Sequence, residues 1–199
     1  RTRRACGPRA VQMSPRITPP MAVLLASHFE TPITSSKASG PPVAVHMCGE
    51  FKMGGVIEGI LTEHRGRVPL SRISVLTATK TFNVPLRAAL NHLSARGVPL
   101  YVHGVDQADA RVRENKLRVS SWHSSKGTEC VVNIVLVPAK SNVNPLYVAL
   151  SRGNTHLHLI FATGRADAHL LSTLAGMPSA MVDGRDDAAR SALSAASVP

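Results

Sequence analysis

Short apolar segments bounded by turn residues recur along this 199-residue chain and alternate with segments of helical periodicity. Apolar runs of this kind are typical of buried strands, and here they span residues 43–47, 73–77, 117–122, 131–137 and 156–163. Residues 98–105 add a further extended segment after Gly97. Because helical segments separate most of the strands, the pattern predicts an α/β fold, with a mostly parallel sheet and helices on both faces.

The helices are predicted from apolar spacing and from the signals at their ends. The first begins at Pro19-Pro20, with proline in its first turn and Thr18 as its cap. The others span residues 49–64, 83–96, 145–152 and 166–175. Two segments without such spacing are predicted to lie outside the helices and strands: 31–42 as a connector, and 106–116 as a loop or short helical turn.

These elements predict one α/β domain over residues 11–165. Before it lies a basic segment, residues 1–10, and after it residues 166–199 are expected to form a helix and a flexible tail rich in Ala, Ser, Asp and Gly. The segment 106–116 is too short to hold an inserted domain. Because the chain starts with Arg1, we expect it to be part of a longer protein.

The chain is strongly basic, with 23 Lys and Arg against 12 Asp and Glu and a formal net charge of +11. Such an excess favours polyanionic partners such as nucleic acid. The alternatives are a merely soluble basic surface, or a GC-rich genome that encodes its cations as arginine, since 17 of the 23 are Arg. Charge alone indicates no reaction.

The three cysteines, Cys6, Cys48 and Cys130, are far apart and form no CxxC pair. No histidine follows them at zinc-finger spacing, so neither a disulfide scaffold nor a structural zinc site is expected. Unpaired cysteines favour a reducing, intracellular compartment. The apolar runs are broken well before the ~18 residues that a membrane helix needs, so no membrane partner is expected.

Two segments carry specific motifs. The first is Val119-Ser-Ser-Trp-His-Ser-Ser-Lys-Gly-Thr-Glu129, and the second, fifteen residues later, is Asn144-Pro-Leu-Tyr-Val-Ala-Leu-Ser-Arg152. In order and separation they resemble motifs V and VI of UvrD/Rep-like superfamily 1 helicases, T-x-H-[SA]-[SAK]-K-G-[LT]-E and L-[YA]-V-[AG]-[LIT]-[TS]-R-A. The resemblance implies the second RecA-like domain of a DNA helicase, a three-layer α/β sandwich.

Weaker similarity extends upstream, so that the resemblance covers residues 11–163. Residues 14–26 are similar to the family's N-[YF]-R-S-T-x-x-I-x-x-x-A stretch, which places Arg16 at the arginine of motif IV. Departures are present: Ser14-Pro15 replaces the Asn-aromatic pair, and Ala78 and Val84 stand where the family usually has arginines.

The resemblance implies that ATP lies in a cleft between this domain and a first lobe. This chain has no G-x-x-x-x-G-K-[ST] loop for phosphates and no acidic pair for Mg²⁺. The first lobe, as a partner, would therefore hold the phosphates and the Mg²⁺. We expect no ATP hydrolysis by this chain alone.

The implied nucleotide-site residues follow from the motif positions. Arg152 is the candidate arginine finger, because a planar, permanently charged guanidinium can stabilise charge on a transferred γ-phosphoryl group. Arg16 is a candidate second clamp, and the resemblance assigns Glu129 to the ribose hydroxyls. Gly127 would let the backbone pass close to the nucleotide, and Lys126 would touch the nucleotide or bridge the two lobes.

The implied contacts to single-stranded DNA lie earlier in the same motif. His123 is the candidate donor to phosphate or a base edge, and three short hydroxyls can contact phosphate without selecting a sequence: Ser121, Ser124 and Ser125. Trp122 is predicted to pack in the core rather than to stack on a base, and Tyr147 to pack the motif VI helix against the sheet.

The resemblance also predicts how these residues are arranged in space, and two other hypotheses compete with it. Arg16 and Arg152 should emerge together near Glu129, at the carboxyl ends of neighbouring strands, with His123 on a different part of the surface. One rival to the helicase hypothesis is a degenerate relative that survives as a basic nucleic-acid-binding or scaffold module. The other is an unrelated α/β domain with coincidental motifs.

Overall fold

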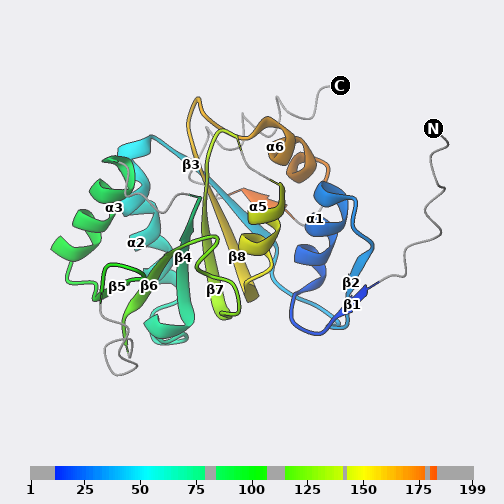
Figure 1. Cartoon of the computed structure of the whole chain (residues 1–199), viewed down its shortest axis with the longest axis horizontal. Coiled ribbons are helices and arrows are strands. Elements are labelled where there is room, and N and C mark those ends of the chain that lie inside the picture. Colours follow the sequence, from blue (N-terminus) through cyan, green and yellow to red (C-terminus); the bar gives the residue numbers. More distant parts are fainter. Residues whose placement is uncertain (1–11, 79–83, 107–114, 141–142, 178–179, 183–199) are drawn as a thin grey trace.

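The computed structural model describes residues 12–78, 84–106, 115–140, 143–177 and 180–182 (Figure 1). Its centre is a seven-stranded sheet in the order β5-β6-β4-β7-β8-β3-β9, in which every neighbouring pair is parallel. The strands are β3 (Val43–Cys48), β4 (Ile73–Thr77), β5 (Leu100–Val102), β6 (Leu117–Ser121), β7 (Cys130–Val137), β8 (Gly153–Ala162) and β9 (Ala180–Val182).

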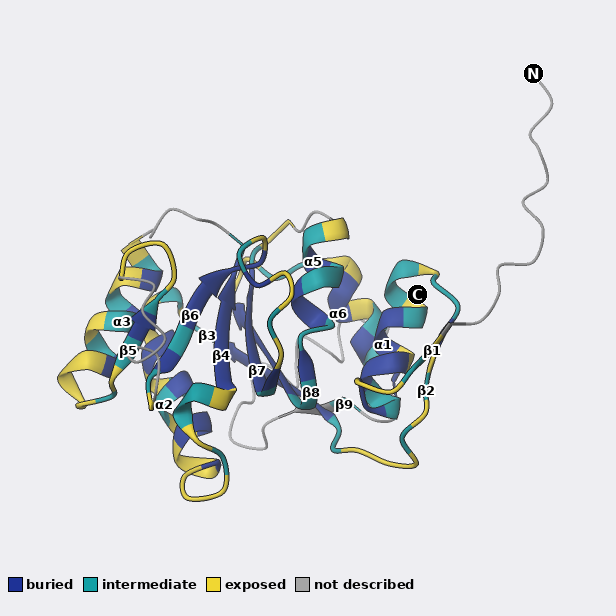
Figure 2. Ribbon diagram, turned by 60° about the horizontal axis from the view of Figure 1, so that its bottom comes forward, coloured by how far each residue is buried: buried dark blue, intermediate teal, exposed yellow. Residues whose placement is uncertain are grey.

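Helices cover both faces of the sheet, as Figures 1 and 2 show. One face is covered by α1 (Pro19–Phe29), α5 (Val143–Leu150) and α6 (Ala168–Ala175), and the other by α2 (Met53–Glu63) and α3 (Val84–Ala95). Two single 3₁₀ turns, η1 (Glu50–Lys52) and η2 (Leu70–Arg72), precede α2 and β4. The parallel sheet with helices on both faces confirms the predicted α/β sandwich.

None of the helices in the described ranges is long and apolar enough to cross a membrane.

Strand β8 illustrates how the sequence builds two cores. Leu157, Leu159 and Phe161 belong to the apolar cluster beneath α1, α5 and α6, whereas Ile160 and Ala162 belong to the cluster beneath α2 and α3. Successive side chains of a strand point to opposite faces, so a strand buried on both sides needs apolar residues at every position. The continuous apolar run at the end of β8 meets this requirement.

Three short strands lie where the sequence indicated no regular structure. The predicted connector 31–42 contains β2 (Ile33–Ser35), which pairs in parallel with β1 (Gln12–Ser14). The predicted tail contains β9, which pairs with the outer side of β3. Three-residue strands give almost no periodicity, and their formation depends on the neighbour that supplies the hydrogen bonds. The basic segment 1–10 and most of the loop 106–116 lie outside the described residues.

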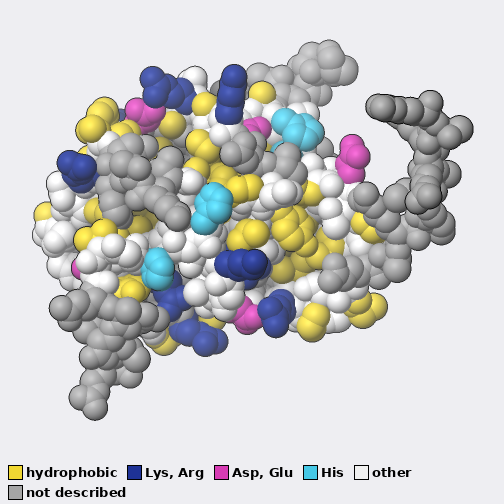
Figure 3. Space-filling view, viewed as in Figure 1, with side chains coloured by type: hydrophobic (Ala, Val, Ile, Leu, Met, Phe, Trp, Pro, Cys, Tyr) yellow, Lys and Arg dark blue, Asp and Glu magenta, His cyan; other side chains and the backbone are white. Residues whose placement is uncertain are grey.

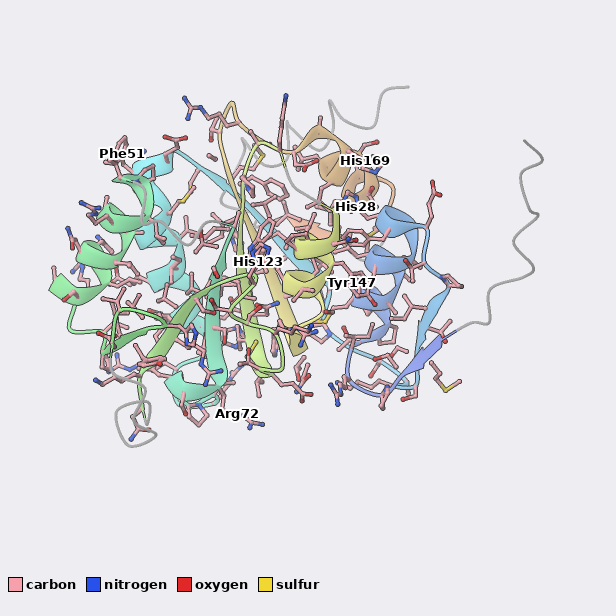
Figure 4. All side chains as sticks on the ribbon, viewed as in Figure 1. His28, Phe51, Arg72, His123, Tyr147 and His169 are labelled. Atoms are coloured by element: carbon pink, nitrogen blue, oxygen red, sulfur yellow. The ribbon has the colours of Figure 1, made fainter. Side chains whose placement is uncertain are left out.

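The parallel sheet has two distinct ends. All strands start at one end, called the amino edge here, and finish at the other, called the carboxyl edge. Figure 4 shows Arg72, just before β4, and His169, which follows β8, at opposite ends of the sheet. These two edges organise the candidate functional residues.

Candidate functional site

Glu129 and Arg152 lie side by side at the amino edge. Glu129 directly precedes β7, Arg152 directly precedes β8, and these two strands are neighbours. The backbone N–H of Cys130 donates to the carbonyl oxygen of Arg152 over 3.2 Å. The strand pairing therefore holds the two motif residues next to each other.

Arg16 reaches the same place from the segment between β1 and α1. Its Nη1 atom lies 2.9 Å from Oε1 of Glu129, and the two side chains are 66% and 42% exposed. An ion pair this exposed is worth less than about 1 kcal/mol. The pair therefore positions both side chains but can be opened at little cost by a ligand.

Two residues that the sequence did not point to complete this cluster. Nδ2 of Asn154 donates to Oε2 of Glu129 over 3.4 Å. Nζ of Lys37 donates to the carbonyl oxygen of Arg16 over 2.6 Å and also to that of Asn154. Lys37 follows β2, in the segment predicted to be a plain connector, so no local pattern could have assigned it to the site. We call Arg16, Lys37, Glu129 and Asn154 the amino-edge cluster.

The Arg152 side chain lies against the end of α5, the helix that precedes it. Its Nε donates to the carbonyl oxygen of Val148 over 2.9 Å, and its Nη2 to Oγ of Ser151 over 3.1 Å. A cation at a helix C-terminus is favourable because the last carbonyls carry partial negative charge. These contacts use two of the five guanidinium N–H groups, so the side chain could still bind an anion.

The expected edge was wrong, although the expected proximity holds. Arg152 and Glu129 stand at the amino ends of strands, not at their carboxyl ends. Motif V runs from the carboxyl end of β6 to the amino end of β7, and α5 likewise leads from the end of β7 to the start of β8. In a parallel sheet each such crossover returns the chain to the amino edge, and both motifs end there.

The backbone after Arg152 is fixed by close packing. A Cβ atom on Gly153 would lie 2.9 Å from Cβ of Asn133 and 3.1 Å from the carbonyl oxygen of His156. Asn133 is fully buried, and its Nδ2 donates to the carbonyl oxygen of Ala149 over 2.7 Å. Gly153 is therefore required where α5 turns into β8.

Cys130 places a thiol beside Arg152, but this thiol is a poor nucleophile at neutral pH. Its Sγ lies 3.5 Å from the carbonyl oxygen of Arg152. Burial raises the pKa of the Cys130 thiol to about 11, so the thiol is protonated at neutral pH.

The predicted DNA contacts form a tight turn at the carboxyl edge, directly after β6. His123 is exposed and Ser124 is half-buried. Ser121 and Ser125 are buried, and the Oγ of Ser125 donates to the carbonyl oxygen of Trp122 over 2.7 Å. Oγ of Ser121 donates to Oγ of Ser124 over 2.9 Å. Ser121 and Ser125 thus hold the turn together, and His123 and Ser124 face outward.

The last part of motif V is exposed and glycine-dependent. Gly127 has a φ of +82°, a left-handed conformation that other residues rarely adopt. A Cβ atom there would meet nothing within 4 Å, so the backbone conformation, not lack of space, requires glycine. Lys126 is exposed beside it, and its side chain makes no hydrogen bond or ion pair within the described part of the chain.

Trp122 and Tyr147 are packing residues. Trp122 is 2% exposed and belongs to the core beneath α1, α5 and α6, which confirms the prediction that it does not stack on a base. Tyr147 meets Phe29 edge to face, with ring centroids 5.3 Å apart. Its ring therefore packs α5 against α1 as well as against the core.

The carboxyl edge also carries a hollow of about 220 Å³ where β4, β7 and β8 end. Thr77, Val137 and Ala162 line it, and an ion pair between Glu50 and Arg165, 2.9 Å apart, lies at its rim. On the face in Figure 3 the described Lys and Arg side chains lie in separate places, not in one continuous patch. The basic charge of the described residues is thus spread out on this face.

Comparisons with known proteins support the fold. No protein-family model matches the chain, and no curated protein matches its sequence. Among solved structures, it is similar to the C-terminal domain of a possible DNA helicase from Lactobacillus plantarum, with a TM-score of 0.60, 17% identity, and coverage of 85% of this chain and 98% of that one. The RecA-like class of α/β fold, found in such helicase C-terminal domains, is therefore that of this chain.

A second similar structure is Saccharomyces cerevisiae Dbp5 bound to Gle1 and IP6, with a TM-score of 0.50 and 13% identity. That match covers 81% of this chain but only 48% of the Dbp5 chain. The chain therefore corresponds to about half of that protein. At these identities the likeness concerns the fold.

Proposed function

We propose that this chain is the second motor domain of an ATP-dependent DNA helicase of the UvrD/Rep-like superfamily 1 type. The observation that carries the proposal is the meeting of Arg16 with Glu129 at 2.9 Å, beside Arg152. These residues belong to three separate motif-like segments, and a shared ligand gives a reason for all three to lie at one edge. The helicase-domain fold of the neighbours supports the same function.

The amino-edge cluster is the proposed contact to ATP. Glu129 would exchange Arg16 for ribose hydroxyls, since a carboxylate accepts hydrogen bonds from either partner. Arg16, released from an exposed pair of low stability, would turn to phosphate. Asn154 and Lys37 would keep the backbone and the Glu129 carboxylate in place during this exchange.

Arg152 is the proposed arginine finger. To reach a γ-phosphate it must leave the carbonyl oxygen of Val148, a loss of about 1 kcal/mol that a charge-assisted contact to phosphate offsets. The close packing at Gly153 would hold the backbone still while the side chain moves.

Magnesium does not fit the amino-edge cluster by itself. Glu129 is its only carboxylate and is paired with Arg16. Mg²⁺ prefers several oxygen ligands in octahedral geometry, usually one or two carboxylates with phosphates and water. The proposed function therefore requires a first lobe that supplies the phosphate loop and the metal ligands, and this chain alone would be without ATPase activity.

His123 and Ser124 are the proposed contacts to single-stranded DNA at the carboxyl edge. Only four residues lie between Ser124 and Glu129, and one of them, Gly127, provides the turn. A short, internally bonded connection of this kind would couple nucleotide at one edge to DNA at the other. That coupling is what a translocating motor needs.

The second candidate is a basic nucleic-acid-binding module without ATPase activity. Two observations favour it: the 199 residues hold no phosphate-loop motif, and the Arg152 side chain is bonded to the end of α5. This module would keep the DNA contacts and lose the nucleotide contacts.

Nuclear magnetic resonance on the ¹⁵N-labelled chain tests the proposal. Titration with ATP should shift the amides of Glu129 and Arg152, and titration with oligo(dT) those around His123. A His123→Ala variant should lose about tenfold in oligo(dT) affinity, and the binding should weaken steeply with salt. Shifts with oligo(dT) but none with ATP, even when a lobe with a phosphate-binding loop is added to the labelled chain, would support the binding module instead. Shifts with neither ligand would refute both candidates.

A further inference from the structure

A group of four histidines lies on the α2 side of the sheet and includes no residue of the amino-edge cluster. His46 comes from β3, His156 and His158 from β8, and His64 from the end of α2. His46, His64 and His158 are 7%, 4% and 4% exposed, and His156 is half-buried. Imidazoles are rarely buried together without a shared reason, because each ring carries two polar nitrogens.

Three of the rings converge on one point. One nitrogen from each of His64, His156 and His158 lies within 4.8 Å of the other two. Nε2 of His64 and Nε2 of His158 are 3.2 Å apart. Two nitrogens bound to one tetrahedral Zn²⁺ at about 2.0–2.1 Å lie roughly 3.3 Å from each other, so this spacing already suits a shared ion.

The fourth histidine, His46, contacts the other ring nitrogen of His158. Nε2 of His46 lies 3.2 Å from Nδ1 of His158, the nitrogen that faces away from His64. A metal-bound histidine usually donates its other N–H to an acceptor, which fixes the tautomer and the ring orientation. His46 can accept the Nδ1 proton of His158 and leave the Nε2 lone pair free for a metal.

We infer that His64, His156 and His158 form a binding site for a divalent transition-metal ion, with Zn²⁺ as the best match. Three neutral imidazoles fit zinc chemistry and leave a fourth position for water. The half-buried His156 provides the open side. The ion would join the end of α2 to strand β8.

The charge state of the rings suits this site. Burial, and then the neighbouring histidines, lowers the pKa of His158 to about 3, and burial also lowers the pKa values of His64 and His156. Neutral rings need not lose a proton to bind a metal. The negative charge of Glu63 raises the pKa values of His64 and His156, and the positive charge of Arg67 lowers the pKa of His64. These charges are secondary to burial.

A chain of hydrogen bonds without metal is the competing explanation. His158 could donate from Nδ1 to His46 and accept from His64 at Nε2, which would satisfy the two 3.2 Å contacts. This arrangement gives no role to the third converging ring, His156. Metal binding distinguishes the two explanations.

The test uses the full chain without an affinity tag, stripped of metal with EDTA. Co²⁺ is added first, because four-coordinate Co²⁺ absorbs visible light far more strongly than six-coordinate Co²⁺. Zn²⁺ is then titrated in competition and also measured by calorimetry. The expected result is one equivalent of bound metal, a four-coordinate Co²⁺ spectrum that Zn²⁺ abolishes, and a Zn²⁺-dependent rise in melting temperature.

Two variants and a matched control locate the site. His64→Gln and His156→Gln should each weaken metal binding by more than about tenfold, in line with loss of one of three ligands. The control is His169→Gln, because His169 and His28 form another close imidazole pair, with ring centroids 4.5 Å apart. This control should bind metal as the unmodified chain does. Circular dichroism of the metal-free variants checks that each is folded.

Several outcomes would overturn the inference. They are the absence of a four-coordinate Co²⁺ spectrum, equal metal affinity in folded His64→Gln or His156→Gln, and loss of binding in His169→Gln alone. The first would favour the metal-free hydrogen-bond chain, and the last would place the metal at the helix surface.

Discussion

At the amino edge, charged and exposed candidate residues from distant segments of the chain meet. At the carboxyl edge, the candidate residues all belong to the five-residue turn 121–125, and their hydroxyls mostly bond to each other. Arg16 and Glu129 pair in solvent, while Ser121 and Ser125 are buried. An exposed pair can exchange partners, and a closed turn presents the same outward groups at all times. The difference suits the two proposed roles, in which a nucleotide is bound and released at the amino edge and single-stranded DNA is held at the carboxyl edge.

The largest effect is expected from Arg152→Ala, in an assembly of this chain with a lobe that carries a phosphate-binding loop. Loss of an arginine finger costs about 10³-fold or more in kcat. Affinity for single-stranded DNA should stay unchanged, since His123 lies at the other edge. Arg152→Lys should not restore kcat, because an ammonium cannot form the planar two-bond contact. Steady-state ATPase assays measure the effect, and an active Arg152→Ala enzyme would contradict the role.

Thiol labelling compares the two edges directly. Cys48 ends β3 and reports on the carboxyl edge, and Cys130 begins β7 and reports on the amino edge. With its pKa raised to about 11, Cys130 has about a hundredth of the thiolate of an ordinary thiol at pH 8. Cys48 is partly exposed. In a Cys6→Ser background, Cys130 should react with iodoacetamide much more slowly than Cys48, and the Cys130 rate should rise about tenfold per pH unit up to about pH 11. Equal rates would show that the start of β7 opens readily.

Gly153→Ala should destabilise the fold by about 1–3 kcal/mol, because the new methyl group would meet Asn133 and the carbonyl of His156. Gly59→Ala, at an exposed position inside α2 with nothing within 4 Å, is the matched control. It should stabilise by up to about 1 kcal/mol. Urea unfolding measures both, and an unchanged midpoint for Gly153→Ala would mean that the amino edge is loosely packed.

The smallest effect is expected from Glu129→Gln, which removes the ion pair with Arg16. The loss of unfolding free energy should stay under about 1 kcal/mol, because both side chains are largely in solvent. ATP-induced shifts should nevertheless weaken if Glu129 contacts the ribose. A loss of several kcal/mol would identify the pair as a structural element of the fold.

The sequence predicted the strands and the turn around His123 better than it predicted the amino edge. Strands β4 and β7 were predictable because they are short, mostly apolar segments, and β6 because its apolar residues Leu117 and Val119 alternate. The turn around His123 was predictable because its motif is contiguous.

The edge at which Glu129 and Arg152 lie was predictable too, because a residue directly before a strand of a parallel sheet lies at the amino edge, and the carboxyl-edge expectation overlooked this. Lys37 and Asn154 give no local signal, because only the fold brings their partners near: two main-chain carbonyls for Lys37 and the Glu129 carboxylate for Asn154.

The histidine group was missed for a related reason. His156 and His158 are two residues apart in a strand, so the sequence places both imidazoles on one face, but the third ligand, His64, ends a helix far back in the chain. The sequence therefore showed half of a site and not the residue that completes it. The expectation of no structural zinc rested on cysteine spacing, which does not report on ligands contributed by separate elements.

Strand β9 has a consequence for how the domain must be handled. It pairs in parallel with residues 43–45 on the side of β3 that β8 leaves open. A recombinant chain that stops before Ala180 would expose the unpaired N–H and C=O groups of a buried, apolar strand, and such an edge invites pairing with other molecules. Truncation in this region would therefore promote self-association and aggregation long before it removed a functional residue.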